Sequence, residues 1–170
     1  DQYLVPTTGS FSPPVTEDEV EAVDTEIAVV ESPVDQTITT NPVYSQTTTD
    51  TNLGIVGVTI SGAQLFNDYE DPDRAFVAVD DNFTIDGVAF VDACNGHPLA
   101  LRADGTGSGD YHYHGIPYCI TDAVDVAGQH STIIGVLLDG FPLYGNKDAD
   151  GVAITSADLD ECSGHVGPTP

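Results

Sequence analysis

The sequence has its clearest chemical signal at Asp110-Tyr-His-Tyr-His-Gly115, where two histidines alternate with two tyrosines. In a strand, successive side chains point to opposite faces, so His112 and His114 would share one face and Tyr111 and Tyr113 the other. Two imidazoles at that spacing can chelate one metal ion, and the tyrosine hydroxyls would orient the ligands from behind. The alternative is a pair of core histidines that only make hydrogen bonds.

The remaining histidines extend this hypothesis. The chain contains five, and we expect all of them to serve a copper-type site: His97, His112, His114, His130 and His165. Imidazole-rich ligation suits copper(II) or zinc, and the absence of Met excludes a thioether ligand. Copper ranks first and zinc second, because the Cys₂His₂ spacing typical of structural zinc is missing.

A second candidate is a calcium site. The run Asn146-Lys-Asp148-Ala-Asp150-Gly151 places oxygen ligands at alternate positions before a glycine, as in an EF-hand loop. The register then slips, because the closing acidic residue arrives one place late, as Asp158. A calcium site of Asn146, Asp148, Asp150 and Asp158 therefore competes with a plain Asp-Gly turn. The acidic run at residues 67–73 is interpreted as a solvated loop.

Three cysteines are present, Cys94, Cys119 and Cys162. One disulfide and one remaining thiol is the simplest arrangement, and spacing alone does not assign the partners. The remaining cysteine is expected to be either a small buried apolar side chain or a thiolate close to the metal.

The charge of the chain limits its partners. Among 170 residues, 28 are acidic and 3 basic, which gives a formal net charge of -25. Such a chain repels nucleic acid and anionic lipid headgroups and attracts cations. No apolar run approaches the roughly 20 residues that span a bilayer, so membrane insertion is not expected. Because the chain begins at Asp1 without Met, we interpret it as the mature form of an exported protein, extracellular or at the cell surface.

Composition divides the chain near Thr51. Residues 1–52 contain no Lys or Arg and are rich in Thr and Pro, which predicts an extended N-terminal arm. From residue 53 to residue 170 the pattern predicts one domain, with turn residues at regular intervals. Strands are expected at residues 54–60, 76–79, 83–91 and 131–138, and a helical start only at 156–161. The predicted fold is mainly β, a compact sandwich-like sheet domain with little helix.

The arm requires a packing partner. Fixing each backbone residue costs about 1–2 kcal/mol, so a segment without its own core becomes ordered only against another surface. That surface is either its own domain or a neighbouring copy. If residues 1–52 add a strand to the next copy's sheet, the contact repeats head to tail and produces a filament. We expect a homo-polymer assembled in this way.

Four ordered stretches together resemble the YHYH-domain family: Val91-Asp-Ala-Cys-Asn-Gly-His97, Tyr111-His-Tyr-His-Gly-Ile-Pro-Tyr-Cys119, Ile134-Gly-Val-Leu-Leu-Asp-Gly-Phe-Pro-Leu-Tyr-Gly145 and Asp158-Leu-Asp-Glu-Cys-Ser-Gly-His165. The resemblance runs from about Gly54 to the end. It implies a secreted domain with a metal site and indicates no particular activity. The first and last stretches also share the internal pattern D-x-C-x-G-H.

From these observations we expect a structural, metal-binding subunit of an extracellular filament or surface polymer. The alternatives are a secreted copper-dependent redox enzyme and a monomeric metal-binding protein. No catalytic residue is predicted, because no general base or substrate pocket can be inferred from the sequence.

Overall fold

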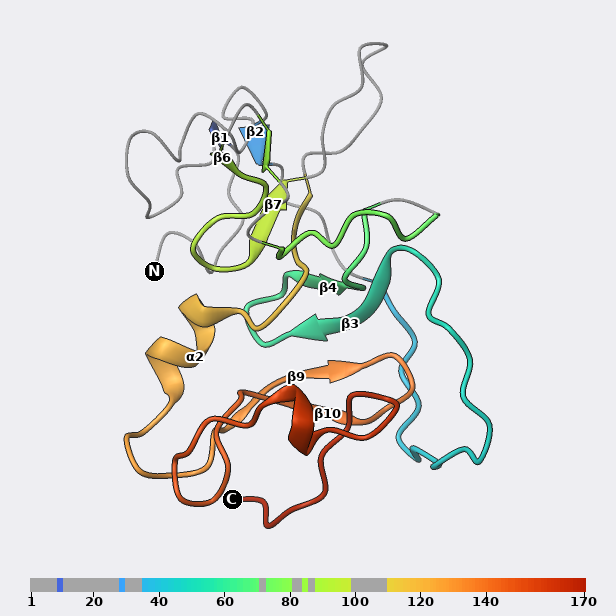
Figure 1. The fold of residues 1–170 in the computed structure, drawn as a ribbon, viewed down its shortest axis with the longest axis vertical. Helices are drawn as coiled ribbons and strands as arrows, with labels where there is room; N and C mark the ends of the chain where they lie inside the picture. The colour runs from blue at the N-terminus through green and yellow to red at the C-terminus, as the bar shows by residue number, and fades with distance from the viewer. Residues whose placement is uncertain are drawn as a thin grey trace.

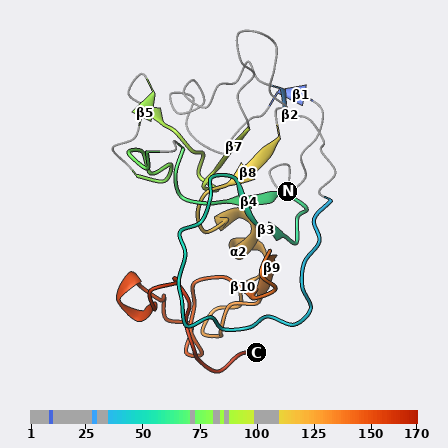
Figure 2. The same cartoon turned by 90° about the vertical axis from the view of Figure 1, so that its right-hand side faces the viewer.

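The computed structural model describes residues 35–70, 73–80, 90–98 and 110–170, together with four two-residue strands in the remainder. The fold is mainly β, as predicted. Its centre is one six-stranded sheet in the order β10-β9-β3-β4-β8-β7 (Figures 1 and 2). Every pair of neighbours is antiparallel except β4 and β8, which run parallel.

The six strands are short. They are β3 (Ile55–Thr59), β4 (Gln64–Phe66), β7 (Gly96–Pro98), β8 (Tyr111–Tyr113), β9 (Ile133–Leu137) and β10 (Pro142–Tyr144). Two further pairs stand outside the sheet: β1 (Gly9–Ser10) with β2 (Ala28–Val29), and β5 (Thr84–Ile85) with β6 (Val88–Ala89). Helix is minor in the described residues, with α2 (Tyr118–Val124) and the 3₁₀ turn η1 (Ser156–Asp158).

The strand predictions hold where the sequence alternates strongly. Residues 54–60 contain β3, residues 131–138 contain β9, and the pair expected around residues 86–87 is β5 with β6. Residues 76–79 are an exception, because they form only an isolated bridge between Val77 and Tyr69. The helical start expected at residues 156–161 is the single turn η1, which Thr155 and Asp158 close with reciprocal hydrogen bonds.

The core packs the tyrosine face of β8 against α2. Its buried members are Ala63, Cys94, Tyr111, Tyr113, Ile120 and Ile134. Tyr113 is completely buried and Tyr111 is 3 % exposed. Because the tyrosines pack in the core, the alternation of side chains along the strand directs the neighbouring histidines to the opposite face.

The described part of the predicted arm, residues 35–52, contains no strand and is almost entirely exposed. It runs to the β9–β10 end of the sheet and returns to β3 (Figures 1 and 2). On the way Thr39 lies against Gly140, and Arg74 donates a hydrogen bond of 2.8 Å to the carbonyl of Thr51. Arg74 also forms an ion pair of 3.3 Å with Asp50. These contacts attach residues 35–52 to their own domain.

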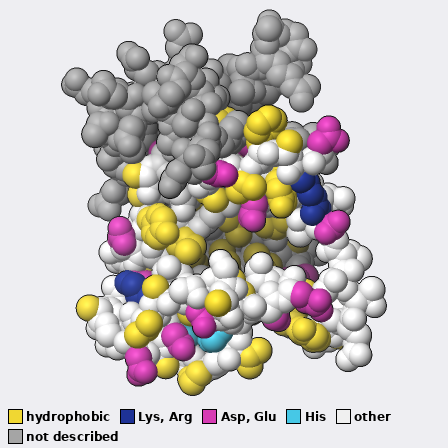
Figure 3. Space-filling model, in the orientation of Figure 1, with side chains coloured by type: hydrophobic (Ala, Val, Ile, Leu, Met, Phe, Trp, Pro, Cys, Tyr) yellow, Lys and Arg dark blue, Asp and Glu magenta, His cyan; other side chains and the backbone are white. Residues whose placement is uncertain are grey.

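The surface reflects the composition. Acidic side chains are distributed over the visible face, with few basic side chains among them (Figure 3). Within the described part of the chain, no helix has the length and apolar character needed to cross a bilayer.

Candidate metal centre

The pairing of β7 with β8 brings three histidines together. Its antiparallel register places His97 directly opposite His112. His114 follows on the same face of the extended chain, and its backbone nitrogen donates to the carbonyl of Asn95 at 2.9 Å. The three residues are buried, with exposed fractions of 8 %, 1 % and 2 % for His97, His112 and His114. The alternation predicted for the Tyr-His-Tyr-His run is therefore present.

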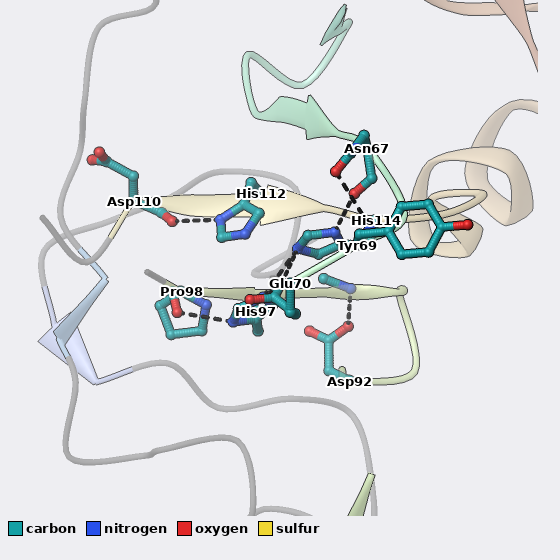
Figure 4. Close-up of polar contacts among 10 residues, drawn as sticks. Asn67, Tyr69, Glu70, Asp92, His97, Pro98, Asp110, His112 and His114 are labelled. Atoms are coloured by element: carbon teal, nitrogen blue, oxygen red, sulfur yellow. Dashed lines mark hydrogen bonds and ion pairs between the residues drawn. The ribbon is translucent and has the colours of Figure 1, made fainter. Parts of the chain in front are cut away.

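Glu70 completes the cluster. One ligand atom from each of Glu70, His97, His112 and His114 lies within 4.8 Å of all the others. Oε1 of Glu70 is 2.7 Å from Nε2 of His114 and 3.1 Å from Nε2 of His97 (Figure 4). The two Nε2 atoms are themselves 3.1 Å apart. Among the described residues, no other group of three or more His, Cys, Asp or Glu side chains meets this criterion.

Backbone carbonyls fix the tautomer of each ring. Nδ1 of His97 lies 3.0 Å from the carbonyl of Pro98, and Nδ1 of His112 lies 3.1 Å from that of Asp110. Nδ1 of His114 lies 2.7 Å from the carbonyl of Asn67. A carbonyl oxygen only accepts hydrogen bonds, so each Nδ1 carries the hydrogen and each neutral ring has its lone pair on Nε2. This is how histidines that bind metals are usually oriented.

The converging atoms need a positive charge between them. Two imidazole lone pairs and a carboxylate oxygen within about 3 Å repel one another unless a proton or a metal ion is shared. Burial favours the neutral form of Glu70, but hydrogen bonding and electrostatic attraction from His114 and His97 outweigh burial and hold the pKa of Glu70 well below its ordinary value. Burial, together with the neighbouring His97, lowers the pKa of His112 to about 3. His112 is therefore neutral near pH 7, as a metal ligand must be.

This shift predicts an acid-sensitive fold in the metal-free protein. The unfolded chain takes up a proton on His112 near pH 6.5, whereas the folded chain resists it until about pH 3. The free energy of unfolding should therefore fall as pH drops through this window, by up to about 4 kcal/mol. Urea unfolding at pH 7 and pH 4 measures the change. A His112→Asn variant should lose a clearly smaller amount; an equal loss would assign the effect to other groups.

Aromatic rings hold two of the imidazoles in place. Phe66 at the end of β4 stacks on His112 with the ring centroids 4.0 Å apart. Phe90 lies against His97 with a centroid separation of 4.4 Å. These contacts limit rotation of the rings and keep water from that side of the cluster.

A tight turn at Asp92 presents His97. Oδ1 of Asp92 accepts hydrogen bonds from the backbone nitrogens of Cys94 at 2.7 Å and Gly96 at 3.1 Å. Oδ2 accepts from the hydroxyl of Tyr111 at 2.8 Å. Burial raises the pKa of Asp92 to about 6, against the effect of these hydrogen bonds, and raises the pKa of Tyr111 well above its ordinary value. Gly96 is required, because a Cβ there would overlap the Tyr111 ring.

The tyrosines thus support the cluster from behind in different ways. Tyr111 anchors the turn that carries His97 by a hydrogen bond to Asp92. Tyr113 lies in the core, where burial raises its pKa to about 12. Its burial anchors β8 between His112 and His114 in the core.

A disulfide between Cys94 and Cys119 links this turn to α2. The third cysteine, Cys162, is a free thiol and is exposed. The expectation that it would be buried or close to the metal is therefore wrong. Cys162 lies in the largely exposed C-terminal segment that follows η1.

The second D-x-C-x-G-H stretch folds into the same turn as the first. Oδ1 of Asp160 accepts hydrogen bonds of 2.8 Å from the nitrogens of Cys162 and Gly164. Ser163 has φ 60°, as Asn95 has φ 61° in the first turn. The internal repeat is therefore structural and is not a coincidence of composition.

Two of the five predicted histidines do not join the cluster. His165 is exposed, with Nδ1 3.2 Å from the carbonyl of Asp158. Nδ1 of His130 is 2.6 Å from the carbonyl of Ser131, and its ring packs against Tyr144 of β10. The structure therefore brings three of the five histidines together: His130 packs against β10, at the opposite edge of the sheet from β7, and His165 lies exposed in the C-terminal segment.

The calcium candidate adopts the alternative conformation, a tight turn. Oδ1 of Asp148 accepts from the nitrogen of Ala149 at 2.6 Å, and Gly151 donates to the Asp148 carbonyl. Oδ2 of Asp158 accepts from both the nitrogen and the hydroxyl of Thr155. The remaining predicted ligands are Asn146, whose carbonyl accepts from Ile154, and Asp150. In the described residues Asp148, Asp150 and Asp158 do not converge as a metal-binding group.

Glu70 is the member of the cluster that the sequence did not predict. It belongs to the acidic run at residues 67–73, which was interpreted as a solvated loop. Its position depends on the parallel pairing of β4 with β8 and on a hydrogen bond of 3.1 Å from its nitrogen to the carbonyl of Phe76. The only sequence signal was a carboxylate a few residues after a predicted strand, which is too common to identify a ligand.

Comparison with known proteins identifies one family. A family model described as YHYH protein matches residues 35–153. The matched range includes all four members of the cluster and ends before the second turn at Asp160. No curated protein and no solved structure matches the chain significantly.

Proposed function

Because the chain belongs to the YHYH protein family, we propose that it binds one divalent transition-metal ion through His97, His112, His114 and Glu70. The observation that carries this proposal is the convergence of Nε2 of His97, Nε2 of His114 and Oε1 of Glu70 within 3.1 Å of one another. Histidines that only make hydrogen bonds in a core would instead direct their Nε2 atoms toward separate donors.

The ligand set favours a borderline ion. Calcium and magnesium prefer shells made entirely of oxygen, whereas three imidazoles and one carboxylate suit copper(II) or zinc. Copper remains first, because divalent first-row ions bind nitrogen ligands with an affinity that peaks at copper. No thiolate takes part, since Cys94 is paired with Cys119 and Cys162 is exposed.

We propose that the ion mainly rigidifies the domain. Its ligands come from β7, from the β8 segment and from the chain after β4. One ion would therefore cross-link three segments that otherwise share only short strand pairs. An ion present at about a thousand times its dissociation constant adds about 4 kcal/mol to the free energy of unfolding.

The test is metal content. Protein stripped with a chelator and titrated with copper(II) or zinc should take up a single ion per chain and melt at a higher temperature. Elemental analysis gives the stoichiometry, and calorimetry gives the shift. A chain that retains neither ion after buffer exchange, and melts at the same temperature, contradicts the proposal.

We also propose that the protein is an extracellular subunit that polymerises through residues 1–52. The exposure of residues 35–52 and their lack of strands support an arm whose backbone is not paired in a strand of its own domain, although Thr39, Asp50 and Thr51 attach it there. Only a few contacts, such as Thr51 with Arg74, hold them to their own domain. Residues 1–34 lie outside the described part of the chain, apart from β1 and β2.

Deleting residues 1–50 should yield a folded monomer, because the sheet, the core and the metal cluster all lie beyond them. Light scattering and electron microscopy of the full and shortened chains compare their assembly. Filaments that persist after the deletion would rule out the arm as the assembly element.

Two alternatives to this function are a secreted copper-dependent redox enzyme and a monomeric metal-binding protein.

A further inference from the structure

Glu70 is held differently from the three histidines. Its side chain is 24 % exposed, whereas those of His97 and His114 are 10 % and 1 % exposed. In the described part of the chain, the contacts of its carboxylate are the Nε2 atoms of His97 and His114. No backbone donor or second side chain fixes it there. The carboxylate therefore has the least support of the four ligands, on the side of the cluster closest to solvent.

The histidines, by contrast, are held by their backbone positions and by contacts of their rings. Each Nδ1 is hydrogen-bonded to a backbone carbonyl, and the rings of His97 and His112 pack on Phe90 and Phe66. Strand pairing in β7 and β8 sets the backbone positions of His97 and His112. Moving any one imidazole would break a buried hydrogen bond, whereas moving the Glu70 carboxylate brings it to water.

We propose that Glu70 is the exchangeable ligand, and that a small anion from solvent can take its place on the ion; this inference rests on the metal site proposed above. Three fixed imidazoles and one replaceable position resemble the arrangement in zinc sites that keep a position open for an external ligand. A singly charged anion would also replace the carboxylate without changing the charge of a largely buried site.

The charge of the protein limits this exchange. A net charge of -25 repels anions at distances up to about the Debye length, which shortens as salt is added. Anion binding should therefore be weak at low ionic strength and become tighter as inert salt is added. This dependence distinguishes binding at the cluster from adsorption to a basic surface patch, which would weaken with salt.

Azide titration of the copper(II)-loaded full chain tests the inference. We expect a new charge-transfer absorption in the wild type, and binding about tenfold tighter in Glu70→Ala, because no carboxylate competes. Asp68→Ala is the matched control, since Asp68 is an exposed carboxylate two positions away and its loss changes the net charge equally. Asp68→Ala should keep the wild-type azide affinity.

The outcomes separate the two proposals. If both the wild type and Glu70→Ala hold copper but neither responds to azide, the exchangeable ligand is refuted and the metal site stands. Equal azide affinity in the wild type and Glu70→Ala, or an equal gain in Asp68→Ala, also refutes it. If the wild type holds no copper at all, the metal site fails, and the inference fails with it.

Discussion

Exchanging His114 for alanine should abolish stoichiometric metal binding. Nε2 of this ring lies 2.7 Å from Oε1 of Glu70 and 3.1 Å from Nε2 of His97, so its loss removes the centre of the ligand set. The residue is 2 % exposed, and removal of its ring also leaves the carbonyl of Asn67 without this donor. We expect the metal-dependent rise in melting temperature to disappear. The corresponding gain in the free energy of unfolding, about 4 kcal/mol at a thousand times the dissociation constant, should disappear with it. Elemental analysis and calorimetry with and without metal measure both effects.

The structure supplies matched controls for this experiment. His130→Ala and His165→Ala also remove an imidazole, but both rings lie outside the cluster. These variants should keep a single ion and the full metal-dependent shift. His97→Ala removes a more exposed ligand and provides a second test if His114→Ala folds poorly. Retention of the ion by both His97→Ala and His114→Ala would show that the metal binds elsewhere.

Replacing both Cys94 and Cys119 by alanine should destabilise the domain by about 3 kcal/mol. The disulfide joins cysteines 25 positions apart, and closing a loop of that size restricts the unfolded chain by roughly this amount. Cys94 is completely buried in the core, so lost packing adds to the effect. Metal affinity should also fall, because the bond ties the turn before His97 to the helix after His114. Urea unfolding and copper titration measure the two changes.

Cys162→Ser is the control, since this thiol is exposed and unpaired. It should leave the urea midpoint and the copper affinity of the oxidised protein unchanged. Destabilisation of this variant to the level of the Cys94 and Cys119 double variant would mean that the pairing is different in solution.

The sequence was most predictive where the information is local. The alternation in residues 110–115 was sufficient to assign two histidines to one face and two tyrosines to the other, because strand geometry has a fixed period of two. The apolar stretches that became β3 and β9 were equally clear. The helix α2 was not predicted, since Pro117 precedes it without a side-chain cap. Its position depends on packing of Ile120 into the core.

The membership of the metal cluster was less predictable, because it depends on strand order. A one-dimensional pattern does not show that β4 pairs in parallel with β8, which brings the chain carrying Glu70 to the histidines. Nor does it show that the β9–β10 end, where His130 lies, forms the opposite edge of the sheet. The sequence paired His112 with His114, but it gave no means of choosing among His97, His130 and His165 until the sheet order was known.

The turn at Asp160 shows what is sufficient to bend the backbone at Asp92. It reaches the same hydrogen-bonded shape as the turn at Asp92 while its cysteine is a free thiol and its histidine is exposed. Neither oxidation nor a bound ion is therefore needed to bend the backbone in this way. The bend before His97 is therefore favoured by its own six residues, and the Cys94–Cys119 bond reinforces a shape that this short stretch already prefers.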